Sequence, residues 1–459
     1  MGKITERQGK MLLTKDKGFY KNFFSLWWML VLNNVIILGV NLADNIMLGN
    51  FSEPALSGAT ACNQLQFIFQ QLILGVGNTM VMMGSQHWGQ KSTESVKKLS
   101  SGALICGAVI GGIFFLLATF IPEQLVMIFT SSEEFIAEGV AYLRIIKYTY
   151  PVFAITNVLL PTLRSVESVR IGFVVSLFTL FTNISLNYIL IFGKLGFNAM
   201  GTEGAAIATL IARATELVVV VVYIAFVDKK LTWRLSDLKG IELSMLKTFI
   251  LACLPVVLTD GLFGVSTALQ TAILGHMEDA AMSANSVAST LFQLLKVASV
   301  GSAGAASVII GRTIGEGRID KTKEYAKTMQ IIFVGIGILT GVSLFFLRAP
   351  IISAYTNISD EAKELANGFL LVLCVTGVGT AYQMPTNTGI VRGGGDSKYV
   401  LIMDLISIWG IVLPLSFLAA FVFNWHPVAV IACLNADQVF KSIPAIIKCN
   451  RFNWMKKLT

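Results

Sequence analysis

The sequence predicts an all-α membrane protein with twelve transmembrane helices, arranged as two pseudo-symmetric six-helix lobes that are related by a parallel repeat. Hydrophobic residues make up 54% of the 459 residues and charged residues only 14%, and the mean hydropathy is +0.71. Apolar runs long enough to cross a bilayer recur along the whole chain, and its first half aligns with its second half. A soluble globule of this composition would have to expose repeated apolar runs.

Twelve predicted spans follow one another with short links. The links after odd-numbered spans are short or acidic, whereas the links after even-numbered spans are rich in Lys and Arg. Because Lys and Arg gather in cytoplasmic loops, we expect both termini to face the cytoplasm of a multi-pass cell-membrane protein. The basic lead-in with Lys3, Arg7 and Lys10 is expected to stay attached. The spans are 22–49, 57–84, 102–121, 138–162, 171–192, 205–226, 247–274, 283–310, 328–347, 365–391, 400–423 and 428–447.

An internal repeat sets the predicted domain organisation. At an offset of 226, which is 274 minus 48, Leu48 meets Leu274, Gly75 meets Gly301 and Lys97 meets Lys323, so spans one and two repeat as seven and eight. Since six spans separate the copies, the repeat is parallel, with its axis along the membrane normal. We therefore expect an N-lobe over 1–226, a cytoplasmic linker over 227–246 that acts as a hinge, and a C-lobe over 247–459. The cleft between the lobes would be the substrate path.

An aspartate in the first span is the strongest functional signal. Asp44 lies in an apolar stretch, although a carboxylate at the bilayer centre costs roughly 2.5–3.5 kcal/mol. At helical spacing, Asn34 and Asn41 share its face. We expect an ion or proton site there; the alternative is a carboxylate that caps or pairs near a helix end. A polar stripe on span five would complete a cation shell or bond helix to helix, and it consists of Ser176, Thr179, Asn183 and Asn187.

Opposite charges lie near the middle of two adjacent spans in the second half. Asp260 is on span seven and Lys296 is on span eight. Pairing them would neutralise two costly intramembrane charges, so we expect them to face each other. The pair is either structural or a switch that opens when a proton or a cationic substrate takes the carboxylate. In the repeat, Asp44 corresponds to Gln270.

Other polar residues in the spans give weaker signals. We expect Tyr382 and Gln383, which lie beside Pro385, to line the C-lobe cavity, and Gln70 to belong to a polar face of span two. Two charged pairs have spacings of three and four and should pair within their own helices, namely Arg213 with Glu216 and Asp437 with Lys441.

Catalytic chemistry finds no support in the sequence. The three histidines lie in or near predicted loops, and the six cysteines lack CxxC spacing. Neither a Walker-type loop nor a GxSxG elbow is present, so we expect no enzyme activity and transport driven by an ion gradient. Orientation in the membrane explains the net charge of +8 better than nucleic-acid binding does.

Several motifs in order resemble the multidrug and toxic compound extrusion (MATE) family. They are DNIMLG (44–49), QHWGQK (86–91), NISLNYILIFG (183–193), GAAIAT (204–209) and GIVRGGGD (389–396), with Pro414 beyond them. The resemblance implies two six-helix lobes and antiport of Na⁺ or H⁺ against organic, often cationic and amphipathic, compounds. Asp44 matches the first-helix aspartate that binds the coupling ion in many members. Asn183 matches the helix-five asparagine, and Thr209 the helix-six threonine.

The chain also departs from the family pattern. Asn187 stands where one branch has a second helix-five aspartate, which leaves Na⁺ and H⁺ both open. Asp260 stands where another branch has a helix-seven glutamate, and that branch's helix-ten acid has no counterpart near Ala381. Lys296 would replace part of that network.

The sequence thus predicts a cation-coupled antiporter that works by alternating access. Asp44, Asn41, Asn183, Asn187 and Thr209 would bind Na⁺ or H⁺, with Na⁺ held by Asp44, Asn183 and Asn187. Substrate would use the central cleft near Asp260, Lys296, Gln270, Tyr382, Gln383 and Gln70. We expect small organic molecules and the lipid bilayer as partners, and a monomer. The runner-up is a flippase for a lipid-linked precursor, which should show several inward-facing Lys or Arg; a channel fits the two-lobed pattern less well.

Overall fold

The computed structural model describes residues 13–129, 132–234, 236–237, 242–277, 279–354 and 359–458. The predicted basic residues Lys3, Arg7 and Lys10, and parts of the linker, lie outside this range. Within it the chain is helical, without a strand. Eleven helices there are long and apolar enough to cross a membrane. The helices α1 to α9 are Lys17–Phe51, Glu53–Gly89, Thr93–Phe120, Pro122–Met127, Glu133–Ile146, Thr149–Ser165, Arg170–Phe192, Gly201–Val222 and Leu243–Gly275.

The second half continues in the same way. The helices α10 to α17 are Asp279–Gly315, Ile319–Ala354, Asp360–Met384, Ser397–Asp404, Leu413–Phe417, Pro427–Leu434, Ala436–Phe440 and Ser442–Arg451. Wider π-helical turns follow α8 (η1, Tyr223–Val227), α12 (η3, Pro385–Val391), α13 (η4, Leu405–Val412) and α14 (η5, Leu418–Val422).

Two of the predicted spans are interrupted in the described structure. The twelfth is divided at Asn435 and Lys441 into α15, α16 and α17. The fourth is interrupted at Lys147 and Tyr148, so α5 and α6 are each shorter than a membrane-crossing helix. A proline follows the break at Pro151, where its missing N–H is tolerated in the first turn of α6. The other predicted spans fall on helices, and several of these helices extend further than predicted, as do α2 and α10.

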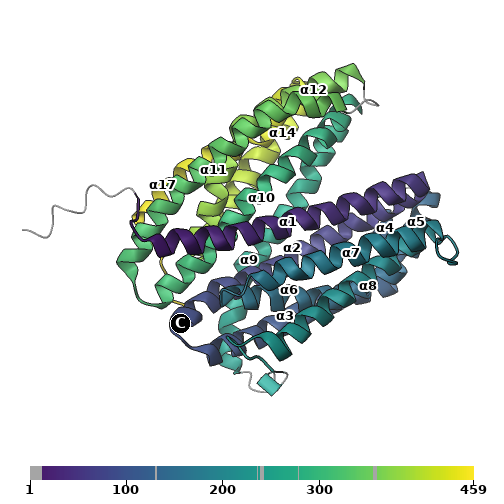
Figure 1. Cartoon of the computed structure of the whole chain (residues 1–459). Helices are drawn as coiled ribbons and strands as arrows, with labels where there is room; N and C mark the ends of the chain where they lie inside the picture. Colours follow the sequence, from purple (N-terminus) through teal and green to yellow (C-terminus); the bar gives the residue numbers. More distant parts are fainter. Residues whose placement is uncertain are drawn as a thin grey trace, which may run out of the picture. The chain divides into compact units, whose positions relative to one another are not determined.

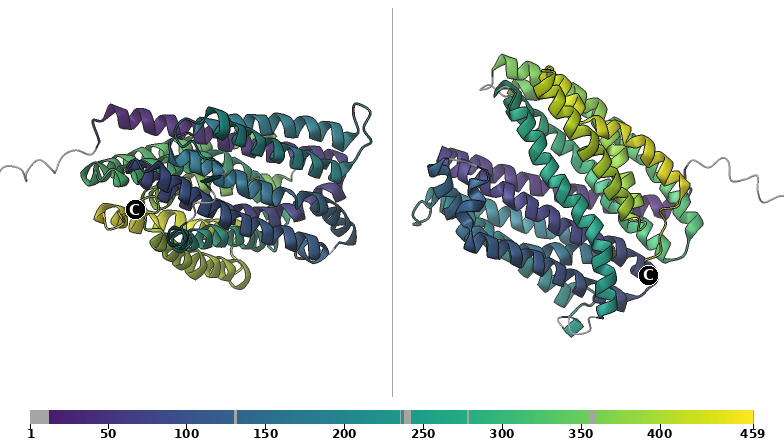
Figure 2. Two further views of the ribbon diagram at one scale, coloured as in Figure 1. Left: turned by 90° about the horizontal axis from the view of Figure 1, so that it is seen from below. Right: turned by 180° about the vertical axis from the view of Figure 1, so that it is seen from behind.

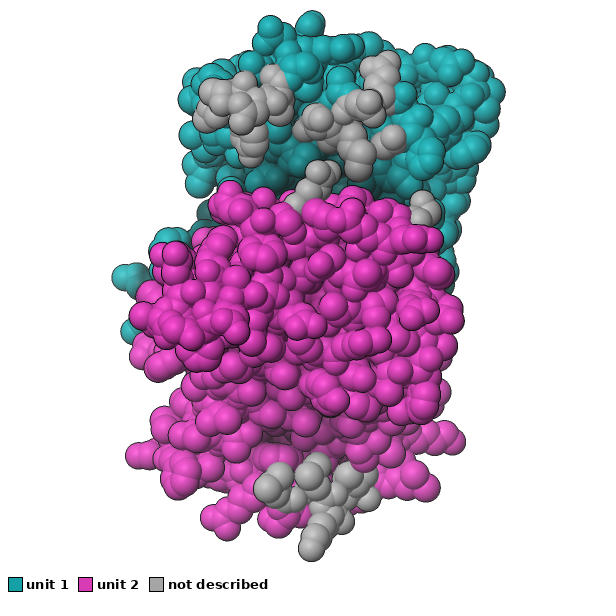
Figure 3. All heavy atoms as spheres, turned by 90° about the vertical axis from the view of Figure 1, so that its right-hand side faces the viewer, with its two compact units in different colours: residues 1–31, 266–459 teal, residues 32–265 magenta. Residues whose placement is uncertain are grey.

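The helices form two compact units, shown in different colours in Figure 3: unit 1 is residues 1–31 with 266–459, and unit 2 is residues 32–265. Both α1 and α9 therefore contribute one part to each unit. The lobes predicted from the repeat divide the chain at 226 and 247 instead, and this functional division stays a prediction.

Unit 2 is built around an aromatic core. Phe69 on α2 contacts Tyr150 on α6 at a ring distance of 4.8 Å and Phe114 on α3 at 5.1 Å. The helices α7 and α8 run side by side (Figure 1). Their close approach depends on Gly204, because a Cβ there would lie 2.8 Å from the carbonyl of Leu190. Glycine at this position thus brings the polar face of α7 close to α8.

Unit 1 holds the beginning of α1 against α10 and α11. The Thr14 N–H donates to Thr328 Oγ1 at 2.9 Å, and Trp27 Nε1 donates to the carbonyl of Ala298 at 3.0 Å. Asp16, just before α1, accepts from the Tyr325 hydroxyl at 2.6 Å. This hydrogen bond is the main reason that the pKa of the Asp16 carboxyl lies below its usual value.

The C-terminal helices of unit 1 run along one bundle (Figure 2), which the chain's last residues close. The Trp454 ring is fully buried and covers Gly394, where a Cβ would lie 2.2 Å from the ring. Asp396 binds Lys448 and Lys456, each at 2.7 Å. Burial alone would raise the pKa of Asp396, but the two ammonium groups outweigh burial and hold it below its usual value. The GIVRGGGD motif therefore forms a docking loop for the tail.

Candidate functional site

A cluster of polar side chains gathers around Asp44 in unit 2. Asn187 Nδ2 on α7 donates both to Asp44 Oδ1 on α1 and, at 3.1 Å, to Asn183 Oδ1 one turn earlier. Asn183 and Asn187 are 1% and 0% exposed. The Oδ1 atom of Asn187 is also buried, and no hydrogen-bond donor reaches it from the part of the chain that the structure describes. A buried amide oxygen without a partner, next to a carboxylate, is an arrangement that a bound cation would satisfy.

The sequence of α7 explains why these two asparagines act together. Residues four apart in a helix lie on one face, so Asn183 and Asn187 project toward the same neighbour. The same face continues to Ser176, which donates to Asn33 on α1. Polar side chains thus join α1 to α7 at two levels, and the predicted stripe does bond helix to helix while it also reaches Asp44.

Helices α5 and α8 supply further polar groups next to this cluster. The hydroxyl of Thr209 on α8 interacts with that of Tyr142 on α5, and Tyr142 is close enough to Asp44 to interact with it electrostatically. Arg213, one turn after Thr209, attracts Asp44 as well. The predicted pairing of Arg213 with Glu216 is confirmed at 2.8 Å. Arg213 therefore links the Asp44 cluster to an ion pair that the sequence indicated only as internal.

Asn41 is placed differently from the other predicted ion-site residues. It is exposed on α1, one turn before Asp44, whereas the amides that hydrogen-bond within the Asp44 cluster are those of Asn183 and Asn187. Its role stays a prediction.

Asp260 belongs to unit 2, where α9 packs closely on α2. Asn78 Nδ2 donates to Asp260 Oδ2 at 3.0 Å. Gly75, one turn before Asn78, allows this approach, since a Cβ there would lie 2.7 Å from the Cα of Val257. Lys296 belongs to unit 1. The expected pairing of Asp260 with Lys296 therefore stays a prediction.

A buried charge network occupies unit 1. Lys441 Nζ on α16's C-terminal side lies 2.9 Å from Asp437 Oδ2 and 2.8 Å from Asp404 Oδ1. The side chains of Lys441 and Asp437 are 4% and 3% exposed. The predicted pairing of these two residues is confirmed, and Asp404 on α13 adds a second carboxylate. Two negative charges thus flank one positive charge inside the helical bundle.

Amide side chains extend this network toward α12. Gln438 Nε2 donates to Asp437 at 2.9 Å, and Gln438 Oε1 accepts from Gln383 Nε2 at 2.8 Å. Gln383 Oε1 in turn accepts from Asn387 at 3.2 Å. Tyr382 is buried, and its hydroxyl donates to Gln330 at 2.7 Å. Gln383 therefore connects with the charges of Asp437 and Lys441, whereas Tyr382 bonds to α11.

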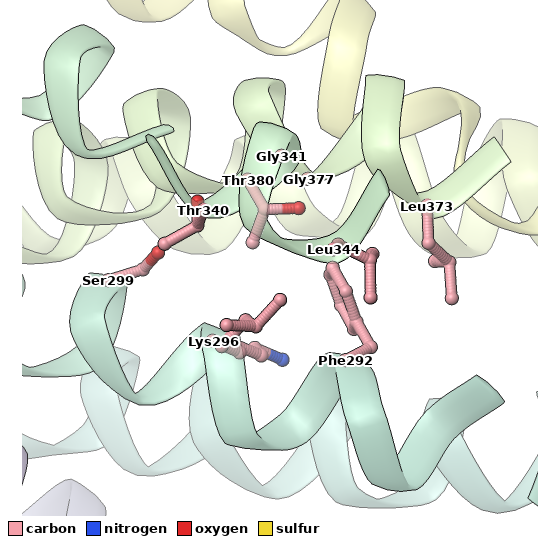
Figure 4. Close-up of a pocket in the computed structure, with 10 residues that line it drawn as sticks. Phe292, Lys296, Ser299, Thr340, Gly341, Leu344, Leu373, Gly377 and Thr380 are labelled. Carbon is pink, nitrogen blue, oxygen red and sulfur yellow. The ribbon is translucent and has the colours of Figure 1, made fainter. Parts of the chain in front are cut away.

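Lys296 lies on α10 and lines a pocket with α11 and α12, drawn in Figure 4. It interacts electrostatically with Asp437 and Lys441. Gln70 and Gln270 are half-buried, in unit 2 and unit 1 respectively. No group of three or more His, Cys, Asp or Glu suited to a metal ion occurs among the residues described.

Comparison with known proteins decides the family. The MatE family model matches residues 30–189 and 255–418, which is most of the chain. The chain belongs to the MatE family. It is therefore a membrane transporter of the multidrug-efflux type, as its sequence motifs indicated.

Curated relatives of this MatE protein carry one description. A probable multidrug resistance protein NorM of Thermotoga maritima is 24% identical, over 92% of this chain and 90% of the relative. The NorM proteins of Halalkalibacterium halodurans and Listeria innocua are 25% and 26% identical, over 90% and 87% of this chain and 89% and 87% of their own lengths.

Solved structures confirm the fold. The MatE chain superimposes with a TM-score of 0.86 and 18% identity on a MOP superfamily transporter from Pyrococcus furiosus, covering 96% of this chain and 97% of that one. The Vibrio cholerae MATE transporter VcmN in its bent form gives a TM-score of 0.83 at 18% identity, covering 95% and 97%.

Three residues of the two clusters escaped the sequence analysis. Tyr142 lies in an ordinary helical pattern, and nothing in its neighbours marks it. Asp404 is an acid inside a predicted span of the MatE chain, a signal that was available, and Gln438 adjoins the charged Asp437.

The internal repeat relates the two clusters. At an offset of 228, Thr209 aligns with Asp437 and Arg213 with Lys441. The two halves thus place their cluster residues at equivalent positions of their last spans.

Proposed function

We propose that this MatE protein is a cation-coupled antiporter that exports small organic, often cationic and amphipathic, compounds by alternating access. The observation that carries the proposal is the contact between Asp44 and Asn187, with its buried amide oxygen next to a carboxylate. A carboxylate in a membrane-spanning helix costs free energy, so such residues usually either pair with another group or take part in transport.

The Asp44 cluster offers chemistry for either Na⁺ or H⁺. For Na⁺, the Asp44 carboxylate and the amide oxygens of Asn183 and Asn187 supply the oxygen ligands that hard cations prefer. For H⁺, protonation neutralises the carboxylate, and Asn187 holds it in place. Thr209 and Tyr142 add hydroxyl groups nearby.

Coupling follows when the two states of the transporter bind the ion with different affinities. An ion shifts a conformational equilibrium only by its differential affinity for the two states. A tenfold ion gradient supplies about 1.4 kcal/mol per ion. Loading Asp44 on one side of the membrane would thus favour one opening of the substrate path, and unloading on the other side would favour the opposite one. The termini would face the cytoplasm, as the loop charges predict.

The test is efflux of a fluorescent organic cation from proteoliposomes under an imposed Na⁺ or H⁺ gradient. We expect one gradient to drive efflux in the wild type and Asp44→Asn to abolish that coupling. If Asp44→Asn still couples and Asp260→Asn fails, the second half runs the mechanism and the assigned roles are reversed. Movement of a labelled lipid across the bilayer of the same vesicles, in the absence of the organic cation, would identify a flippase instead.

A second variant tests the amide ligand. If Na⁺ is the coupling ion, Asn187→Ala removes an oxygen ligand and a hydrogen bond to a charged group, which is worth about 1.5–3 kcal/mol. The Na⁺ concentration for half-maximal efflux should then rise roughly tenfold or more. The matched control is Asn198→Ala in the exposed loop before α8, and an equal rise in both variants would refute the assignment.

A further inference from the structure

A surface groove in unit 2 lies between α4 and α5, and its lining residues are different from those of the Asp44 cluster. The two helices pack on each other at one end of the unit (Figure 1). One face of α5 lines the groove, because Glu133, Ala137, Ala141 and Arg144 follow one another at helical spacing. The groove has a volume of about 380 Å³, which is enough for a small ligand or for the headgroup of a lipid.

Opposite charges lie at the two ends of this groove. Glu123 is in the first turn of α4 and Glu133 in the first turn of α5, whereas Arg144 is in the last turn of α5. All three residues are exposed. Arg144 lies about 16 Å beyond Glu133 along the helix axis, and its Cα–Cβ bond is tilted back toward that end. The groove therefore runs from an acidic end to a basic end.

Apolar side chains form the walls between these charges. Ile136 and Val140 come from α5, and Met127 comes from α4. Met127 is 57% exposed, and the next residue, Ile128, is 69% exposed. An exposed apolar surface of this kind in a membrane protein is suited to contact with acyl chains. The walls thus favour a lipid over a ligand from the aqueous phase.

We propose that the groove binds phosphatidylethanolamine, with the lipid phosphate on Arg144 and its ammonium group on Glu123 and Glu133. Arg144 would repel a simple organic cation and the two glutamates would repel a simple anion, so the charges match a headgroup that carries both. A guanidinium group donates two parallel hydrogen bonds to a phosphate, and a primary ammonium group donates three, which carboxylates accept. This lipid site goes beyond the proposed function, because it is separate from the ion and substrate sites.

Headgroup chemistry gives the two kinds of charge separable roles. Phosphatidylcholine carries the same phosphate, but its quaternary ammonium group has no N–H to donate. Arg144 should therefore contribute to the binding of both lipids. The glutamates should favour phosphatidylethanolamine, since only that lipid offers them hydrogen-bond donors.

The experiment measures lipid binding to the full-length, detergent-purified transporter by native mass spectrometry, which gives the dissociation constant of the first bound lipid. We expect the wild type to bind phosphatidylethanolamine about tenfold more tightly than phosphatidylcholine. Glu133→Gln should weaken phosphatidylethanolamine binding about fivefold and change phosphatidylcholine binding less than twofold, whereas Arg144→Gln should weaken both about tenfold. Ala137→Phe fills the groove without removing a charge and should also weaken both.

Two matched controls separate the groove from general effects of charge. Glu134→Gln changes the neighbouring exposed carboxylate in the same first turn of α5, which is outside the groove lining. It removes the same favourable interaction with the helix dipole that Glu133→Gln removes. Lys194→Gln removes a positive charge in the exposed loop after α7. Both controls should leave the two dissociation constants unchanged.

Three outcomes would overturn the proposal. The first is equal binding of the two lipids by the wild type. The second is a preference that persists in both Glu133→Gln and Ala137→Phe, which would place the lipid elsewhere. The third is an equal loss in Glu133→Gln and Glu134→Gln, which would reduce the effect to the helix dipole. Glu133→Gln and Ala137→Phe decide the question where Arg144→Gln does not fold. Because binding is measured without an ion gradient, failure of the antiporter assignment would leave this result intact.

Discussion

Replacement of Lys441 by methionine tests whether the buried charge network stabilises unit 1. The ammonium group lies 2.8 Å from Asp404 and 2.9 Å from Asp437, and the Asp437 side chain is 3% exposed. Two unit charges 2.9 Å apart attract by about 6 kcal/mol at an effective dielectric constant of about 20. Desolvation offsets most of this attraction, but removal of one partner leaves a buried carboxylate unpaired. We expect Lys441→Met to cost about 3–5 kcal/mol, which lowers the Tm by about 10 °C in a unit of this size.

The assay is thermal unfolding of the detergent-purified protein, followed by tryptophan fluorescence. The rescue variant combines Lys441→Met with Asp404→Asn and Asp437→Asn, so that no charge stays buried without its partner. Replacing a whole buried ion-pair network is often neutral, so the triple variant should recover most of the lost Tm. A Tm loss below about 2 °C in the single variant, or an equal loss in the triple variant, would refute the reasoning.

Two further predictions concern the loop that docks the C-terminal tail and the residue Asp16 just before α1. Gly394→Ala places a methyl group 2.2 Å from the Trp454 ring, so it should cost about 1–3 kcal/mol in thermal unfolding, whereas Gly172→Ala, with no atom within 4 Å, should be neutral or stabilising. Equal effects of the two changes would contradict the packing of the tail. The Asp16 carboxyl has a pKa below its usual value because Tyr325 donates to it, so its contribution to stability is complete at neutral pH and is lost as the pH falls through that lowered pKa. The Tm difference between the wild type and Asp16→Asn should accordingly be present at pH 7 and shrink as the pH falls through the lowered pKa, and a difference that persists unchanged in acid would show another cause.

The polar residues show which contacts the sequence pattern could predict and which it could not. Asp44 and the stripe of Asn183 and Asn187 stood out because polar groups are rare in spans and because residues four apart share a helix face. The structure does bring Asn187 to Asp44. For Lys441, the spacing of four indicated Asp437 but gave no sign of Asp404, which comes from a different helix.

The sequence by itself determined the all-helical membrane fold, the approximate positions of its spans, the family and the intramembrane acids. Hydropathy, helical period and the internal repeat can all be read from the order of residues along the chain. Only the tertiary structure decided which side chains meet. The break between α5 and α6, the docking of Trp454 on Gly394 and the joining of Gln383 to Asp437 through Gln438 depend on packing between distant segments. Such contacts are set by the shape of the whole helical bundle, and no single helix encodes them.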